Sequence, residues 1–144
     1  EKIDKVFENS VYICLTRNPY AQIQSNIRRY NTDTIDATKK YISYLKYQKH
    51  NLKKLEKTIL ITYEELTNSP LKTKEKISNF LPQLNDIKVD IKFNAHNVLE
   101  KNEMKITNLN KESIASLSKN QIDSINTVLK KEKDLISFFN YSIL

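Results

Sequence analysis

Residues 11–19 of the chain read Val-Tyr-Ile-Cys-Leu-Thr-Arg-Asn-Pro, and this stretch decides the fold. Residues 10–16 are rich in β-branched and aromatic side chains and are apolar on both faces, which is typical of a buried strand in a parallel sheet. Arg17 ends the run, Asn18 is a good helix N-cap and Pro19 is a good first helical residue. The stretch therefore predicts a strand that turns directly into a helix. An arginine at such a junction in an open α/β sheet favours an anion site.

The predicted helix runs from Pro19 to about Tyr30 and has two distinct faces. At 100° per residue, its apolar face consists of Tyr20, Ile23, Ile27 and Tyr30. Ser25 lies on the opposite, polar face, eight residues after Arg17. A guanidinium fork and a hydroxyl on one exposed side suit a phosphate group. The alternative is an arginine that forms a structural pair with a carboxylate, and the residues alone favour neither interpretation.

The rest of the chain alternates further helices and strands. Periodicity and capping residues predict a helix over residues 34–55, a strand over 58–63, a helix over 69–81, a strand over 87–93, a helical turn over 113–117 and a last helix from Ser118 to about Phe139. This order is typical of an α/β layered fold. We expect a single domain over residues 1–144, and because the chain begins without Met we expect it to be the later part of a longer protein.

Composition narrows the possible functions. The net charge of +7 favours an anionic partner, but lysines spread along the whole chain argue against a dedicated nucleic-acid tract. Glycine is absent, which excludes a Walker loop or a GxGxxG loop within these residues. The single cysteine, Cys14, is expected in the core. There is no membrane-spanning run and no signal peptide, so we expect a cytoplasmic protein.

Three further groups of residues are candidates for ligand contacts. Tyr63 directly follows the second strand, where it would stack on a flat ligand or close the core. His96 and Asn97 lie in a polar segment suited to a ligand contact, whereas His50 is expected on the surface. A row of tyrosines on the long helix, at positions 41, 44 and 47, suits either helix packing or an acceptor pocket. Two isolated histidines and one cysteine do not make a metal site, so no metal is expected.

These residues resemble a known family. Thr16-Arg17-Asn18-Pro19, followed by Ser25, resembles the 3′-phosphate-binding motif of the PAPS-dependent sulfotransferases, and the spacing matches. Residues 61–70, Ile-Thr-Tyr-Glu-Glu-Leu-Thr-Asn-Ser-Pro, are similar to the family's Tyr-Glu-Asp-Leu…Pro segment. The end of the chain is similar to the C-terminal helix of bacterial members, with Asn140 in place of a glycine. The resemblance covers residues from about 10 to the end.

The resemblance implies a fold, a ligand and residue roles. The fold would be a partial three-layer α/β/α arrangement on a parallel sheet, as in sulfotransferases and P-loop NTPases. Arg17 and Ser25 would hold the 3′-phosphate of PAPS or of adenosine 3′,5′-bisphosphate, Tyr63 would lie near the adenine, and His96 and Asn97 would make late-chain cofactor contacts. The acceptor, whether carbohydrate, lipid, small molecule or protein, is not implied.

Departures from the family leave other function classes open. The glycine- and lysine-containing loop that binds the 5′-phosphosulfate, the catalytic base that follows it and the Arg-Lys-Gly element are all missing, so these 144 residues are not expected to catalyse sulfuryl transfer and no catalytic residue is assigned. One alternative is a non-catalytic nucleotide- or anion-binding module. Another is a basic adaptor that binds acidic polymers through its lysines.

Overall fold

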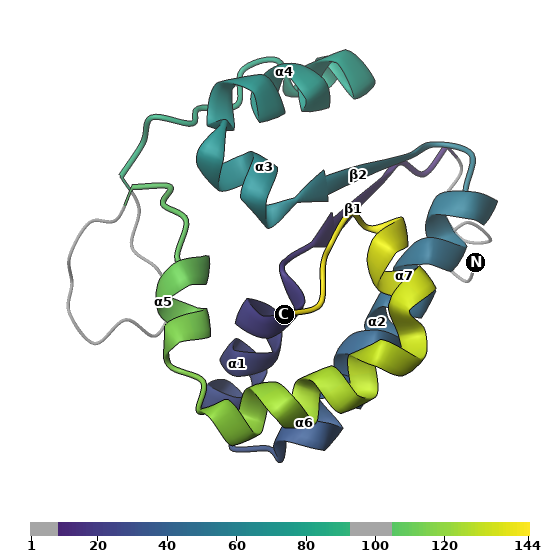
Figure 1. The fold of residues 1–144 in the computed structure, drawn as a ribbon. Helices are drawn as coiled ribbons and strands as arrows, with labels where there is room; N and C mark the ends of the chain where they lie inside the picture. The colour runs from purple at the N-terminus through teal and green to yellow at the C-terminus, as the bar shows by residue number, and fades with distance from the viewer. Residues whose placement is uncertain (1–8, 93–104) are drawn as a thin grey trace. The chain divides into compact units, whose positions relative to one another are not determined.

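The computed structural model describes residues 9–92 and 105–144 and has the predicted α/β character (Figure 1). The elements in chain order are β1 (Tyr12–Thr16), α1 (Pro19–Tyr30), α2 (Thr34–Lys54), β2 (Thr58–Thr62), α3 (Tyr63–Asn68), α4 (Pro70–Phe80), the 3₁₀ turn η1 (Pro82–Leu84), α5 (Asn110–Ala115), α6 (Lys119–Leu129), the 3₁₀ turn η2 (Lys130–Glu132) and α7 (Lys133–Phe138). In the described ranges, β1 and β2 pair as a two-stranded parallel sheet.

The chain divides into two compact units, and the second is inserted into the first. Unit 1 consists of residues 1–60 and 109–144, and unit 2 consists of residues 61–108. Unit 1 therefore holds β1, α1, α2 and all the helices from α5 onward, whereas α3, α4 and η1 belong to unit 2. Each unit is described separately below.

The strand β1 forms where it was predicted, but the prediction that both of its faces are buried is wrong. Cys14 and Thr16 are buried on one face, whereas Ile13 and Leu15 are 45% and 46% exposed on the other. Side chains alternate across a strand, so a strand that is covered on one side leaves every second residue in contact with solvent. An apolar run over 10–16 does not reveal which face is covered.

The helix α1 begins and ends at the residues that its sequence predicts. The Asn18 side chain accepts hydrogen bonds from the backbone N–H groups of Tyr20 and Ala21, and Pro19 occupies the first turn, where its missing N–H costs nothing. At the other end, Asn31 adopts the left-handed conformation with φ of 47°. Tyr20 and Ile23 are fully buried as predicted, but Tyr30, which was expected on the same apolar face, is 57% exposed.

The core of unit 1 is formed by helices α1, α2, α6 and α7 (Figure 1). Its buried members share helical spacing on facing sides and include Tyr20, Ile23, Tyr41, Leu45, Ile125, Leu129, Ile136 and Phe139. Each such side chain contributes about 1.5–3 kcal/mol when fully removed from water. The single last helix predicted from Ser118 to Phe139 is interrupted: α6 ends at Leu129, η2 makes one tight turn, and α7 follows. The interruption reorients the chain while Leu135, Ile136 and Phe139 remain buried.

The end of the chain is tied back onto the first strand and the first helix. After α7, Asn140 adopts φ of 59°, and the Tyr141 N–H donates to the carbonyl of Ile136, which is the hydrogen bond of a Schellman motif. The reversed chain places the Tyr141 hydroxyl 3.3 Å from Thr16 Oγ1. The Tyr20 hydroxyl joins α1 to two later segments, because it donates to Asn126 Oδ1 and accepts from the Leu144 N–H at 2.8 Å.

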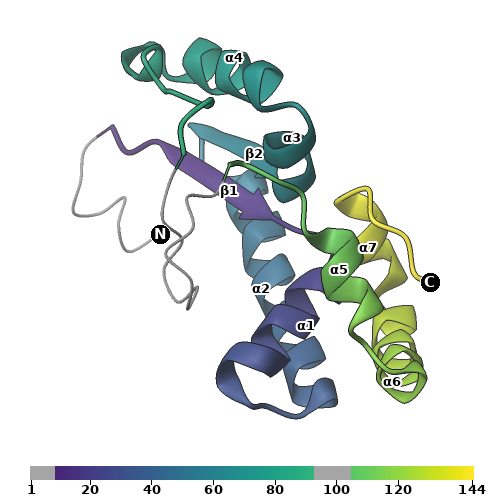
Figure 2. The ribbon, with the colours of Figure 1, turned by 90° about the vertical axis from the view of Figure 1, so that its left-hand side faces the viewer.

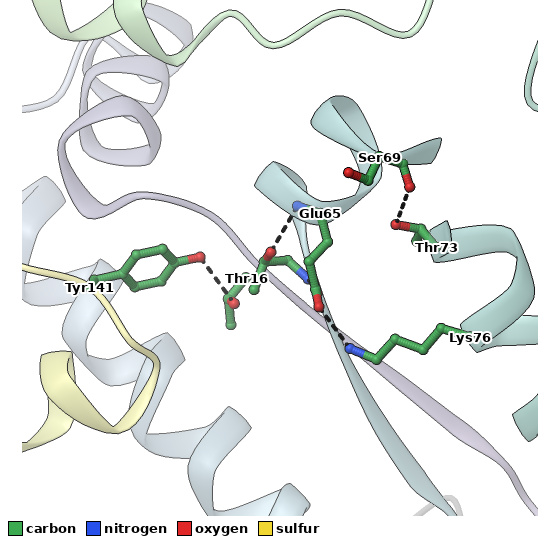
Figure 3. Close-up of polar contacts among 7 residues, drawn as sticks. Thr16, Glu65, Ser69, Thr73, Lys76 and Tyr141 are labelled. Atoms are coloured by element: carbon green, nitrogen blue, oxygen red, sulfur yellow. Dashed lines mark hydrogen bonds and ion pairs between the residues drawn. The ribbon is translucent and has the colours of Figure 1, made fainter. Parts of the chain in front are cut away.

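Unit 2 is organised around a capping box at the start of α3 (Figure 3). Thr62 Oγ1 accepts from the Glu65 N–H at 3.0 Å, and Glu65 Oε2 accepts from the Thr62 N–H at 2.8 Å. The helix α4 begins at Pro70 and stops before Pro82 as predicted, and Leu71 in its first turn is 67% exposed. The strand predicted over residues 87–93 is wrong for residues 87–92, which have no regular structure, and Phe93 lies outside the described residues.

Asparagine takes the place of the missing glycine. In the described part of the chain, positive φ angles occur at Asn9, Asn31 and Asn140. Asparagine visits the left-handed region more readily than other residues with a Cβ, because its short amide side chain bonds locally. Two of the three positions, Asn31 and Asn140, follow helix ends, where glycine is usual.

Candidate functional site

Arg17 occupies the junction between β1 and α1 and is half-buried in unit 1. Its Nε donates to Asn110 Oδ1 at 2.7 Å, and its Nη2 lies 3.3 Å from Ser113 Oγ. Both partners come from α5, which packs beside α1 (Figure 2). The Asn110 and Ser113 side chains therefore help to orient the guanidinium.

The backbone of Arg17 is fixed as well as its side chain. The Tyr41 hydroxyl, from α2, donates to the Arg17 carbonyl oxygen at 2.8 Å, and Tyr41 is only 3% exposed. The next tyrosine of the same helix, Tyr44, donates to the Leu15 carbonyl at 3.1 Å. Residues 15 and 17 alternate with residue 16 along the strand, so both hydroxyls reach the same edge of β1. The tyrosine row thus has a definite contact in two of its members, while Tyr47 is 68% exposed.

The N-terminus of α1 supplies no free amide for an anion. Pro19 has no N–H, the N–H groups of Tyr20 and Ala21 bond to Asn18 Oδ1, and the Gln22 N–H bonds to the Asn18 carbonyl. These are the amides that would otherwise bind a phosphate at a helix N-terminus. Recognition of an anion here would have to come from side chains, with Arg17 as the main source of charge.

Ser25 lies half-buried on the second turn of α1, six residues beyond Pro19. At 1.5 Å per residue, that places it about 9 Å along the helix axis from the first turn. Arg17 and Ser25 are thus both in unit 1 and are fixed by the same strand-to-helix turn. The sequence did not identify Asn110 and Ser113, which lie 93 and 96 residues away from Arg17. Their polar side chains, three residues apart at the start of a short helix, gave no signal that distinguished them from surface residues.

Tyr63 belongs to unit 2 and is the first residue of α3. It is half-buried, and its hydroxyl donates to the Thr107 carbonyl at 3.0 Å, while Asn108 Nδ2 bonds to Asn68 Oδ1 at 2.8 Å. These two bonds hold residues 107–108 against α3. His96 and Asn97, the other predicted ligand contacts, lie outside the described residues.

A polar hollow of about 420 Å³ lies between α3 and α4 in unit 2. Glu65 lines this hollow, and its Oε1 forms an ion pair with Lys76 Nζ at 2.9 Å (Figure 3). Burial raises the pKa of the Glu65 carboxyl, but the Thr62 N–H bond, the hydrogen bond and charge of Lys76, and the Thr62 hydroxyl outweigh it, so that the pKa lies below the usual value. The Glu65 carboxylate is therefore favoured in its charged form by the hydrogen bonds and the ion pair that hold it.

The single cysteine, possible metal ligands and possible membrane spans were each considered within the described residues. Burial raises the pKa of the Cys14 thiol, which is buried in the sheet and suits the predicted core role. Among residues 9–92 and 105–144, no three His, Cys, Asp or Glu side chains gather as metal ligands. Over the same ranges, no helix has the length and apolarity needed to cross a bilayer.

The chain was compared with family models, with curated proteins and with solved structures. No family model, no curated protein and no solved structure matches it.

Proposed function

We propose that this chain forms the nucleotide-gripping part of a PAPS-dependent sulfotransferase, in which Arg17 and Ser25 hold the 3′-phosphate. The observation that carries the proposal is the placement of Arg17. It stands directly after a strand, its carbonyl accepts a hydrogen bond from Tyr41, and its guanidinium contacts the side chains of Asn110 and Ser113. A cation held in this way loses little side-chain entropy when it binds an anion, which favours affinity.

The proposed reaction is an in-line attack of a hydroxyl or amine on the sulfur of PAPS, with adenosine 3′,5′-bisphosphate as the leaving product. Negative charge builds on the leaving phosphate and on the sulfonate oxygens, so catalysis needs positioned donors around both. In this proposal the chain contributes binding and orientation through the 3′-phosphate, and none of its residues takes part in the chemical step. The finer fold that the proposal requires is a three-layer α/β/α sheet architecture of the P-loop type.

The proposal is tested by comparing two nucleotides by titration calorimetry. Adenosine 3′,5′-bisphosphate carries the 3′-phosphate and adenosine 5′-monophosphate lacks it, so the difference in affinity isolates the contact with Arg17. We expect the bisphosphate to bind more tightly, and Arg17→Ala to remove about 2 kcal/mol or more, which is about 30-fold in Kd. Ser25→Ala should remove a smaller share of the same preference.

The matched control is Arg28→Ala, which deletes an exposed arginine from the last turn of the same helix. This variant loses the same formal charge and should keep the preference for the bisphosphate. Equal losses in Arg17→Ala and Arg28→Ala would refute the proposal, since they would mean that net charge alone attracts the nucleotide. The assignment of Tyr63 to the adenine is tested separately, by Tyr63→Ala with both nucleotides.

A further inference from the structure

A lysine-rimmed groove lies between α2 and the end of α6 in unit 1, and none of its lining residues is assigned to the proposed nucleotide site. Its volume is about 350 Å³. Ile42 and Val128 supply its apolar floor, and Lys39, Lys46 and Lys131 surround it, with Glu132 as the one carboxylate. Figure 1 shows α6 lying across α2. The groove is thus apolar at its base and basic at its rim.

The positive charge continues along α2 beyond the groove. At 100° per residue, Lys39, Lys46, Lys49 and Lys53 fall within about 80° of one another around the helix axis. Lys39 and Lys53 are fourteen positions apart, which is about 21 Å at 1.5 Å per residue. We call these four residues and Lys131 the lysine stripe. All five belong to unit 1, four of them on α2 and Lys131 in η2.

An aromatic ring, that of Phe138, lies beside Lys49 and Lys53 at the C-terminal end of the lysine stripe. Phe138 of α7 is 39% exposed, and the ammonium groups of Lys49 and Lys53 lie 4.7 Å and 5.9 Å from its ring centroid. The two cations occupy the ring face, so the ring is not available for stacking with a base. The surface therefore has an apolar floor in the groove, with lysines at the rim of the groove and over the Phe138 ring.

The carboxylates near the stripe neutralise part of its charge. Glu132 pairs with Lys46 at 2.5 Å, and Asp36 lies 4.0 Å from Lys39. The side chains of the second pair are 67% and 71% exposed, so this pair adds little to stability. Among the described residues, these two carboxylates offset two of the five ammonium charges of the stripe, which leaves net positive charge beside the apolar floor.

We propose that the lysine stripe and its groove bind an acidic, amphipathic peptide segment. The positive charges of the stripe favour an anionic partner. The apolar floor favours a partner that also has apolar side chains, as when an amphipathic helix docks into a groove. A nucleic acid fits less well, because the stripe contains no arginine for bidentate phosphate contacts and its one exposed ring is covered by lysines. A helix of fourteen residues matches the length of the stripe.

The test uses fluorescence anisotropy with three labelled probes. The first is a 14-residue peptide in which Glu and Leu alternate at helical spacing. The second replaces every Leu by Ser at the same charge, and the third is a single-stranded oligonucleotide of matched charge. We expect the Glu/Leu peptide to bind at low salt at least about tenfold more tightly than either of the others, and to weaken as salt rises.

Two charge-reversed proteins locate the binding surface. Lys39→Glu combined with Lys131→Glu should weaken binding of the Glu/Leu peptide at least about tenfold. Lys111→Glu combined with Lys119→Glu changes the net charge equally at exposed positions away from the groove and should bind like the wild type. The proposal is overturned if the Ser peptide or the oligonucleotide binds as tightly, or if both double variants weaken binding alike. Arg17→Ala should bind the peptide normally, which separates this result from the nucleotide proposal.

Discussion

The Tyr41 hydroxyl donates a 2.8 Å hydrogen bond to the backbone carbonyl of Arg17, across 24 residues of sequence. This bond joins the middle of α2 to the turn between β1 and α1, and it fixes the peptide from which the guanidinium projects. Since the Arg17 side chain is also held by Asn110 and Ser113, three separate segments of unit 1 determine where one positive charge lies.

Replacing Tyr41 by phenylalanine removes this hydroxyl and keeps the buried ring. We expect the free energy of unfolding to fall by about 1 kcal/mol, because the Arg17 carbonyl loses a partner in a partly buried site. If the nucleotide proposal holds, affinity for adenosine 3′,5′-bisphosphate should fall as well, with the loss smaller than for Arg17→Ala. Urea unfolding and calorimetry measure the two effects.

The control for Tyr41→Phe is Tyr44→Phe, which removes a hydroxyl of the same helix that bonds to Leu15. Tyr44 is 46% exposed, so water replaces the lost bond and the cost in stability should be smaller. A bisphosphate affinity that drops equally in both variants would contradict a positioning role for Tyr41.

The Glu65 carboxylate should make stability depend on pH in the acid range. Its pKa is lower in the folded protein than the ordinary value of 4.5, so folding is favoured by its charge above that pH. The contribution is lost as pH falls through the lowered folded pKa. We expect the urea midpoint to fall between about pH 5 and pH 3, and Glu65→Gln to flatten that fall.

Lys76→Met supplies the second arm of this experiment, because it removes the ammonium group that pairs with Glu65 at 2.9 Å. It should flatten the same part of the curve in part, since the Thr62 bonds remain. A midpoint that falls as steeply in Glu65→Gln as in the wild type would rule out this carboxylate as the source.

Asn140 should tolerate glycine and reject alanine. Its φ of 59° places a Cβ in the left-handed region, where glycine has no penalty and most other residues lose about 1 kcal/mol or more. We expect Asn140→Gly to match or exceed the wild-type melting temperature and Asn140→Ala to fall below it by a few degrees. Asn120→Ala, in the exposed first turn of α6, is the control and should change little. Equal melting temperatures for the glycine and alanine variants would contradict the role of the turn.

Local signals in the sequence predicted where helices and strands begin and end better than they predicted which side chains are buried. Asn18 and Pro19 fixed the start of α1, and Pro70 and Pro82 bracketed α4, because caps and prolines act on their own backbone. The helix α3 was missed although Thr62 and Glu65 form a readable capping box, since the stretch was interpreted as the end of a strand.

Properties that depend on distant residues were not readable. Alternating apolar residues over 87–92 suggested a strand, but a strand forms only where a partner edge exists, and these residues have none in the described structure. The exposure of Ile13 and Leu15 likewise depends on what covers β1, not on the strand itself. At the candidate site, Arg17 was found from its local turn, whereas its partners on α5 required the folded chain.

The bonds from Tyr141 to Thr16 and from Leu144 to Tyr20 can form only late in the synthesis of the chain on the ribosome. These contacts join residues 125 and 124 positions apart, so β1 and α1 emerge long before the segment that completes their core. Unit 2, which is continuous in sequence, can gather its own contacts in the meantime. During translation the hydrogen bonds that Tyr141 and Leu144 make to β1 and α1 therefore form only after residues 141–144 have left the exit tunnel.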